Sequence, residues 1–338
     1  MRFSRSLTVL ATGLFAVSMY AADPRGTFNT VELDHIEPLA HSRAAWVDEQ
    51  GVMRSGGVCA SRHYSPEEMA VLEAQQMQDL MTGRRSIRTE YSAPAVIKVN
   101  FHVIVDGNKG AVSATVINNT IAKLNQTYSG GEGGFNTGLS FVWNNPVNGQ
   151  PKTYNNRTWY AAKPGSRGEI EMKTTISAMA GNNPQTVLNI YTNAPGTYMG
   201  GTLLGWATFP WELAGNVGMD GVVMNNIALA LGGTTSYNAG DVVAHEVGHW
   251  LGLYHTFQGG CTGSTGYDGT TGLGDLVADT APEASAASGC PGGRDTCAGG
   301  AVDPIDNYMD YSSNACQTRL TSGQNDRLVL KSALRPLL

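Results

Sequence analysis

The chain has 338 residues, 41% of them hydrophobic, and carries 22 basic and 28 acidic side chains. This length and apolar content suffice for one sizeable core and a smaller additional region. The mildly acidic balance has no basic stripe and so gives no electrostatic reason to expect nucleic-acid binding, and no second long apolar run predicts a membrane span.

Residues 1–22 have the features of a secretory signal peptide. Two arginines precede an apolar stretch over residues 7–17, and the small residues Ala21 and Ala22 follow. The apolar stretch is too short to span a membrane comfortably, so we predict export with cleavage near these alanines and an extracellular location. Export permits disulfides and, in a eukaryotic host, glycans. The sequons that would accept them are Asn118, Asn125 and Asn156.

Residues 23–88 are polar and contain one strong helix signal. Ser65, Pro66 and Glu68 supply an N-cap, a first-turn proline and a capping-box acid. The segment has too little apolar content for a core of its own, so we interpret it as a propeptide lying on the main domain. Its basic end, MTGRRSIR at 81–88, is predicted to be an exposed cleavage linker. The alternative is an N-terminal extension that stays attached.

Residues 89–338 form the predicted main domain, with an upper subdomain to about residue 255 and a lower one over 256–338. Strands and helices alternate in the upper part, which indicates a sheet with helices packed on it. Strands are expected at 96–105, 139–143, 187–192, 201–210 and 221–226, and helices after Ser113 and near 168–180.

Two details of these strands bear on function. Glycines and a terminating proline suit 201–210 to a sheet edge, where it could pair with an extended substrate backbone. His102 is expected to be a packed strand histidine rather than a metal ligand.

The stretch HEVGHWLGLYH at 245–255 carries the strongest chemical signal. Its apolar spacing predicts an amphipathic helix, which places His245 and His249 on one face at metal-binding separation. Glu246 lies too far round to complete the coordination shell but can hydrogen-bond a water on the metal, which is the position of a general base.

A third ligand follows a turn. Gly252 has no Cβ and can take the chain out of the helix, so that His255 returns to the metal. Three imidazoles leave a fourth tetrahedral position for water, as in catalytic zinc sites. A surface helix that merely contains histidines is disfavoured, because three of only 7 histidines fall here at the required offsets.

Five cysteines leave one unpaired in an exported chain. Cys261, Cys290, Cys297 and Cys316 lie in a segment rich in Gly, Asp and Ser, which needs cross-links because it cannot bury a core. They can form two disulfides in three connectivities; a structural zinc is the weaker alternative without a close CxxC pair. Beyond them, Thr321 and Gln324 form a capping box that begins a C-terminal helix.

The extended motif HExxHxxGxxH is the signature of metzincin endopeptidases. The chain resembles the pappalysin family (M43) of secreted metalloproteases. The residues that carry this resemblance are HEVGHWLGLYHTFQGGC at 245–261, GCPGGRDTC at 289–297 and NYMDY at 307–311. The resemblance runs from about Val96 to the C-terminus. It implies an α+β, metzincin-like fold: a twisted, mostly parallel sheet with an antiparallel edge strand over an active-site helix, and a loop-rich, disulfide-stapled C-terminal subdomain.

The resemblance also implies roles for single residues. It favours the pairs Cys261 with Cys297 and Cys290 with Cys316. Met309 matches the methionine turn beneath the metal, and Tyr311 matches a tyrosine that hydrogen-bonds the tetrahedral oxyanion. The thiolate of Cys59 is expected to occupy the open zinc position in a latent precursor, as in cysteine-switch zymogens.

A calcium site is expected in the glycine-rich loop after His255, because flexible loops with oxygen ligands suit calcium and the family includes calcium binders there. Asp275 and Asp279 are the first candidates. The alternative is that both are solvated turn carboxylates.

We therefore expect a secreted, monomeric zinc endopeptidase made as a zymogen, acting on proteins or peptides, with no nucleic-acid or membrane partner. Zinc would activate a water, and Glu246 would accept its proton. The alternatives are a zinc amidase on cell-wall or small amides and a catalytically silent binding protein of the same fold. The second is disfavoured because the catalytic set is complete.

Overall fold

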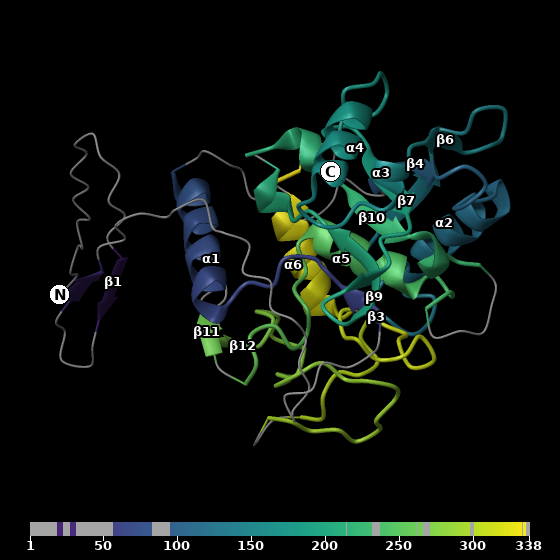
Figure 1. Ribbon diagram of the computed structural model, residues 1–338. Coiled ribbons are helices and arrows are strands. Elements are labelled where there is room, and N and C mark those ends of the chain that lie inside the picture. Colours follow the sequence, from purple (N-terminus) through teal and green to yellow (C-terminus); the bar gives the residue numbers. More distant parts are fainter. Residues whose placement is uncertain are drawn as a thin grey trace. The chain divides into compact units, whose positions relative to one another are not determined.

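Figure 1 shows the computed structural model. The structure describes residues 19–22, 28–31, 57–82, 95–213, 215–231, 237–261, 263–265, 271–297, 301–332 and 334–335. Residues 1–18 of the predicted signal peptide and residues 83–88 of the predicted linker at 81–88 lie outside this range. No helix in the described ranges is long and apolar enough to cross a membrane.

Two compact units make up the chain, residues 1–42 and residues 43–338. The first contains an antiparallel pair, β1 (Met19–Ala22) with β2 (Phe28–Val31). The second contains the remaining elements, including the helix predicted in the propeptide, α1 (Pro66–Met81).

One mixed sheet organises the second unit. Its main path runs in the order β3-β9-β10-β7-β4-β5, with β6 also on β4 and β8 also on β9. The strands are β3 (Gly57–Cys59), β4 (Ala95–Val105), β5 (Leu139–Trp143), β6 (Lys152–Asn155), β7 (Leu188–Asn193), β8 (Thr197–Tyr198), β9 (Gly201–Ala207) and β10 (Val222–Asn225). The five predicted strands are confirmed within a few residues, whereas the short strands β3, β6 and β8 were not predicted.

Strand directions match the expected architecture. The pairs among β10, β7, β4, β5 and β6 are parallel, and β9 runs antiparallel to β10. The outer side of β9 is occupied by β3, which runs parallel to it. In the full sheet β9 therefore lies between β3 and β10 and not at the edge, which corrects the prediction. Residues 95–231 alone would leave β9 at the edge, and β3 from the N-terminal side covers it.

Helices lie on both faces of the sheet. The helices of this unit, besides α1, are α2 (Ala114–Tyr128), α3 (Arg157–Tyr160), α4 (Arg167–Ser177), α5 (Asp241–Leu251) and α6 (Ser322–Ser332), with short 3-10 turns η1 (Pro210–Glu212), η2 (Val217–Met219) and η3 (Asn226–Ala228). The main core joins α2 and α5 to one face, and a second cluster joins α4 to the other. The predicted cap of α2 is confirmed, because the Ser113 hydroxyl accepts a hydrogen bond from the Val116 amide.

The C-terminal segment contacts helix α5 through Arg335. The Arg335 side chain donates from Nε to the Trp250 carbonyl at 2.7 Å and pairs with Asp220 at 2.7 Å. Its guanidinium lies 3.9 Å from the centroid of the Trp250 ring. Because Trp250 directly follows His249, these contacts fix the C-terminal turn of the helix that carries the histidine motif.

The lower region, residues 256–335, is mostly loop, as expected. Disulfides join Cys261 to Cys297 and Cys290 to Cys316, which confirms the pairing that the family resemblance implied. A hairpin of β11 (Gly263–Thr265) and β12 (Thr271–Leu273) was not predicted. The capping box that begins α6 is confirmed by reciprocal hydrogen bonds between Thr321 and Gln324.

His102 is buried on β4 and is packed, as predicted. Its Nε2 lies 2.9 Å from the Asn189 amide oxygen, and its ring stacks on Tyr191. Burial lowers its pKa to about 4 from the ordinary 6.5, a depression that the Asn189 contact reduces only in part.

We expect His102 to make the fold acid-sensitive. Below pH 6.5 the unfolded chain takes up a proton that folded His102 refuses until about pH 4, so stability is lost as the pH falls through this window. The loss from this residue should be about 3 kcal/mol between pH 7 and pH 4. Denaturant titrations of wild type and His102→Gln at both pH values measure it. Identical pH dependence in the two proteins would contradict the assignment.

Candidate metal centre

Three imidazoles converge at one point beside β9. The Nε2 atom of His249 lies 3.0 Å from that of His245 and 3.0 Å from that of His255, and all three side chains are buried. Together with Cys59 they form the one cluster of at least three His, Cys, Asp or Glu ligand atoms lying within 4.8 Å of one another among the described residues. The local spacing thus brings the predicted ligands together.

Backbone carbonyls orient two of the rings. The Nδ1 atom of His245 lies 2.7 Å from the Tyr308 carbonyl oxygen, and that of His249 lies 2.8 Å from the Leu253 carbonyl. A carbonyl can only accept, so each Nδ1 carries the proton and each Nε2 presents a lone pair inward.

The arrangement fits a divalent metal such as zinc. Burial lowers the pKa of His245 to about 4 and lowers the pKa values of His249 and His255 well below their ordinary value. Neutral imidazoles are the form that binds metal. The Nε2 lone pairs of His245 and His249 face each other across 3.0 Å, and they repel unless a cation lies between them. The three histidines could therefore hold zinc.

The turn after α5 has the predicted form. Gly252 has φ of 107°, a left-handed conformation that a residue with a Cβ rarely adopts. Its amide donates to the carbonyls of Gly248 and His249, which ends the helix and directs the chain back through Leu253 to His255.

Glu246 lies fully buried against β9. A Cβ on Gly205 would come within 2.8 Å of the Glu246 side chain, so a glycine in the strand permits this approach. The Oε2 atom of Glu246 accepts a hydrogen bond from the Ser61 hydroxyl at 2.8 Å. The Oε1 atom of Glu246 has no hydrogen-bond partner among the described residues. Burial raises the pKa of Glu246 to about 8, although the hydrogen bonds from Cys59 and Ser61 act in the opposite direction. A raised pKa makes a carboxylate a stronger proton acceptor.

Cys59 and Ser61 bring the N-terminal segment into the centre. The Cys59 thiol lies 3.4 Å from Glu246 Oε2 and belongs to the cluster with the three histidines. It is the free cysteine of the chain. Ser61 bridges two elements, because its hydroxyl donates to Glu246 and accepts from the Ala207 amide of β9 at 2.8 Å. Sequence reasoning identified Cys59 but missed Ser61, which shows no motif of its own.

Tyr311 and Met309 lie close to the histidines. The Tyr311 ring packs edge-on against His255, with centroids 5.0 Å apart, and its hydroxyl donates to the Cys59 carbonyl at 3.3 Å. Met309 is fully buried, and a Cβ on Gly248 would lie 2.5 Å from its sulfur. The methionine thus packs directly under the helix that carries the histidines, and Gly248 inside the HEVGH motif makes room for it.

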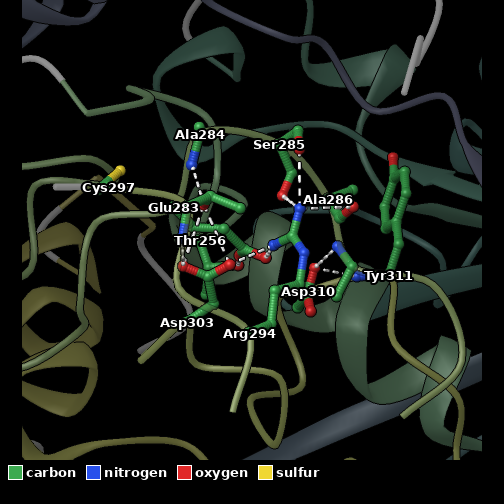
Figure 2. A network of polar contacts seen from close by, with 12 residues as sticks. Thr256, Glu283, Ala284, Ser285, Ala286, Arg294, Cys297, Asp303, Asp310 and Tyr311 are labelled. Carbon is green, nitrogen blue, oxygen red and sulfur yellow. Dashed lines mark hydrogen bonds and ion pairs between the residues drawn. The ribbon is translucent and has the colours of Figure 1, made fainter. Parts of the chain in front are cut away.

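A polar network joins the loops that follow His255 in the sequence (Figure 2). Thr256 donates to Glu283 at 2.8 Å, and Arg294 pairs with Glu283 at 2.6 Å and with Asp303. Asp310 accepts from the amides of Ala287 and Tyr311 at 3.0 and 2.7 Å. The network connects Thr256 and Asp310, the neighbours of His255 and Tyr311, to the disulfide-linked loop. It therefore restricts the positions of both side chains.

The two candidate calcium ligands have different surroundings. Asp279 uses both oxygens at the start of α6, accepting from the Thr321 hydroxyl at 2.7 Å and the Gly323 amide at 2.8 Å. Asp275 is buried and accepts from Thr280 at 2.8 Å, while its Oδ2 has no hydrogen-bond partner among the described residues. Burial raises the pKa of Asp275 to about 7.

Comparison with known proteins agrees with this geometry. The family model Peptidase_M43, described as pregnancy-associated plasma protein-A, matches residues 175–333. An extracellular metalloprotease of Sordaria macrospora is 39% identical over 246 residues, covering 70% of this chain and 75% of the relative. One of Podospora anserina is 36% identical over 270 residues, covering 78% and 82%.

Solved structures share the fold. A promirolysin mutant of Tannerella forsythia aligns with a TM-score of 0.63 at 24% identity, over 83% of this chain and 96% of that chain. Mature mirolysin in complex with a cleaved peptide aligns with a TM-score of 0.55 at 25% identity, over 72% and 97%.

The fold and the histidine centre define a metzincin-like zinc metalloendopeptidase. The chain belongs to the pappalysin family, M43, and its relatives are extracellular metalloproteases. Its substrates are proteins or peptides, and the family implies a catalytic zinc.

Proposed function

We propose that the chain is a secreted endopeptidase made as a zymogen, in which His245, His249 and His255 bind the zinc and Glu246 is the general base. The observation that carries this proposal is the convergence of three neutral imidazoles on one point beside a buried carboxylate. When bound there, zinc supplies a Lewis acid for the scissile carbonyl and acidifies water.

The chain's own residues supply the remaining chemistry. Glu246 accepts the proton of the attacking water and passes it to the leaving amine. The Tyr311 hydroxyl, which now donates to the Cys59 carbonyl, is available to donate to the oxygen that gains negative charge. Beside them β9 offers main-chain groups to an extended substrate once β3 has left, with Met309 as the floor of the centre.

Latency rests on the segment around Cys59, within a propeptide spanning residues 23–88 and ahead of a catalytic domain at 89–338. In the present arrangement β3 covers the β9 edge. The Ser61 hydroxyl donates a hydrogen bond to Glu246, and the Cys59 carbonyl accepts one from the Tyr311 hydroxyl. Burial and then the charge of Glu246 raise the pKa of the Cys59 thiol. A bound metal would act in the opposite direction, because its positive charge would stabilise the thiolate. The comparison with mirolysin supports an inhibitory role for this segment. The alignment with the mirolysin precursor covers 83% of the chain, whereas the alignment with the mature form covers 72%.

Secretion is supported by the signal-peptide pattern of residues 1–22 and by relatives named as extracellular. A calcium ion is proposed at Asp275, whose Oδ2 has no hydrogen-bond partner among the described residues. Because both oxygens of Asp279 already bind the start of α6, this residue supports the site indirectly, by fixing the loop.

Tyr311→Phe should lower kcat by about 10²-fold and change KM little, because it removes a donor that acts on the transition state. Initial rates on a fluorogenic peptide, with circular dichroism to verify folding, measure this. An unchanged kcat would exclude Tyr311 from transition-state stabilisation.

The experiment that tests the proposed function is the digestion of an unfolded protein by the full chain, before and after limited tryptic cleavage in the basic segment 84–88. We expect the intact chain to be latent and the cleaved chain to produce new peptide termini, read by mass spectrometry. Hydrolysis of small amides without any new protein termini would favour the amidase alternative.

A further inference from the structure

A basic recess lies beside the metal centre, on the surface that α1 covers. Arg327 and Lys331 are four residues apart on α6 and so face the same side. The Arg327 guanidinium lies 4.5 Å from the Tyr254 ring centroid, and the Lys331 ammonium lies 5.8 Å from that of Trp211. We call these four residues the basic recess.

One carboxylate fills the basic recess. Glu73, on α1, lies with one oxygen 2.8 Å from Arg327 and the other 2.5 Å from Lys331, and all three side chains are buried. Burial alone would raise the pKa of Glu73, but the two cations outweigh it and lower the pKa to about 2. The recess is thus built to take an ionised carboxylate, one oxygen on each cation.

Arg327 and Lys331 are also held by contacts outside α1. Arg327 Nε donates to the Gly252 carbonyl at 2.9 Å, and the Lys331 stem lies against Gly252, so both side chains rest on the turn that ends α5. Lys331 Nζ otherwise contacts Gln76, which is also on α1. Removal of the propeptide therefore leaves Arg327 and Lys331 without the carboxylate of Glu73, which pairs with both.

The recess is also continuous with the metal centre. Tyr254 precedes the ligand His255, and Phe209 packs both on Tyr254, with centroids 5.8 Å apart, and on the ligand His249, at 5.2 Å. The propeptide itself spans this distance, since Cys59 lies at the metal centre and Glu73 lies in the recess. A polypeptide bound at the metal centre can therefore reach the recess.

We propose that in the mature enzyme the basic recess binds an Asp or Glu side chain of a polypeptide substrate, at a distance from the cleaved bond, and so selects acidic segments. This inference rests on the proposed function, because it requires a propeptide that leaves. The propeptide uses Glu73 to occupy the same site.

The test compares cleavage by the full chain after tryptic maturation, in wild type, Lys331→Met and Lys98→Met. Methionine keeps the aliphatic stem of Lys331 without the charge, and Lys98 is an exposed lysine on β4 that serves as control. Substrates are paired peptides that share one cleavage sequence and differ by a single flanking Glu or Gln, placed at a series of spacings on either side.

At one spacing, wild type and Lys98→Met should cleave the Glu peptide at least about tenfold faster than its Gln partner, and Lys331→Met should lose this preference. Equal cleavage of all pairs by wild type, or a preference that survives in Lys331→Met, would overturn the proposal.

A binding measurement separates this outcome from failure of the proposed function. A labelled peptide of residues 63–82 lacks Cys59 and is titrated into the matured chain, alongside its Glu73→Gln form. Tighter binding of the Glu73 form by at least about tenfold, lost in Lys331→Met, supports the recess even if no peptide is cleaved. Equal binding of the two forms would reject the recess as a carboxylate site.

Discussion

Glu246→Gln is expected to lower peptide-bond hydrolysis by about 10²–10⁴-fold without loss of zinc, because the amide keeps the volume of the side chain but cannot accept the water's proton. Glu246 touches no histidine nitrogen in a described hydrogen bond, so the ligand set should remain intact. The measurement is kcat on a fluorogenic peptide with zinc content determined on the same sample.

The matched control is Glu171→Gln, which alters an exposed carboxylate on α4 that pairs only with exposed Arg167 in the described contacts. This variant should keep wild-type activity. Full activity in Glu246→Gln at unchanged zinc content would remove Glu246 from the mechanism, whereas loss of zinc would make it a structural residue of the centre.

Cys59→Ala should make the uncleaved chain active, with an increase in peptidase activity of at least about tenfold over the wild-type precursor, equivalent to losing about 1.4 kcal/mol of inhibitory binding. The thiol is the one described side chain of the N-terminal segment that joins the ligand cluster. Ser61 still contacts Glu246 in this variant, so we expect activity below that of the matured enzyme. Activity of the intact chain is measured after confirming its mass.

Two variants make this result specific. Glu67→Gln, on the exposed start of α1, should leave the precursor latent, and Cys59→Ala combined with Glu246→Gln should remain inactive. A Cys59→Ala precursor as latent as wild type would show that β3 pairing and Ser61 suffice for inhibition, and that the thiol is dispensable.

The local part of the site could be read from the sequence because its geometry is set within a few residues. Helical spacing places His245 and His249 on one face, and the left-handed turn at Gly252 returns His255, so no distant partner is needed to predict them. The same holds for the capped starts of α2 and α6. In each, a side-chain hydroxyl accepts a hydrogen bond from the backbone amide three residues later.

Contacts between distant segments were not accessible in this way. Ser61 reaches Glu246 across 185 residues, and Glu73 reaches Lys331 across 258, and neither lies in a recognisable motif. The carbonyls of Tyr308 and Leu253 orient two of the histidines through backbone atoms, which a side-chain pattern does not reveal. Strand β3 has three residues, too few for a strand pattern in the sequence, and it pairs with the distant strand β9.

Glycines gave a signal that was read only in part. Gly205 was taken as a mark of an edge strand, and the structure adds that its missing Cβ admits Glu246. Gly248 stands inside the histidine motif at a helix position where glycine is unfavourable, and contact with Met309 explains it. A glycine that costs helix or strand stability next to a chemical motif therefore indicates close packing at the site.

The most direct test of a catalytic zinc held by the three histidines is digestion of an unfolded protein by the matured chain, with zinc content measured before chelation, after chelation and after zinc is restored. We predict one zinc per chain, cleavage that stops when the metal is removed, and cleavage that returns with it. Cleavage that persists in the zinc-free chain, or no cleavage with zinc fully bound, would contradict this account.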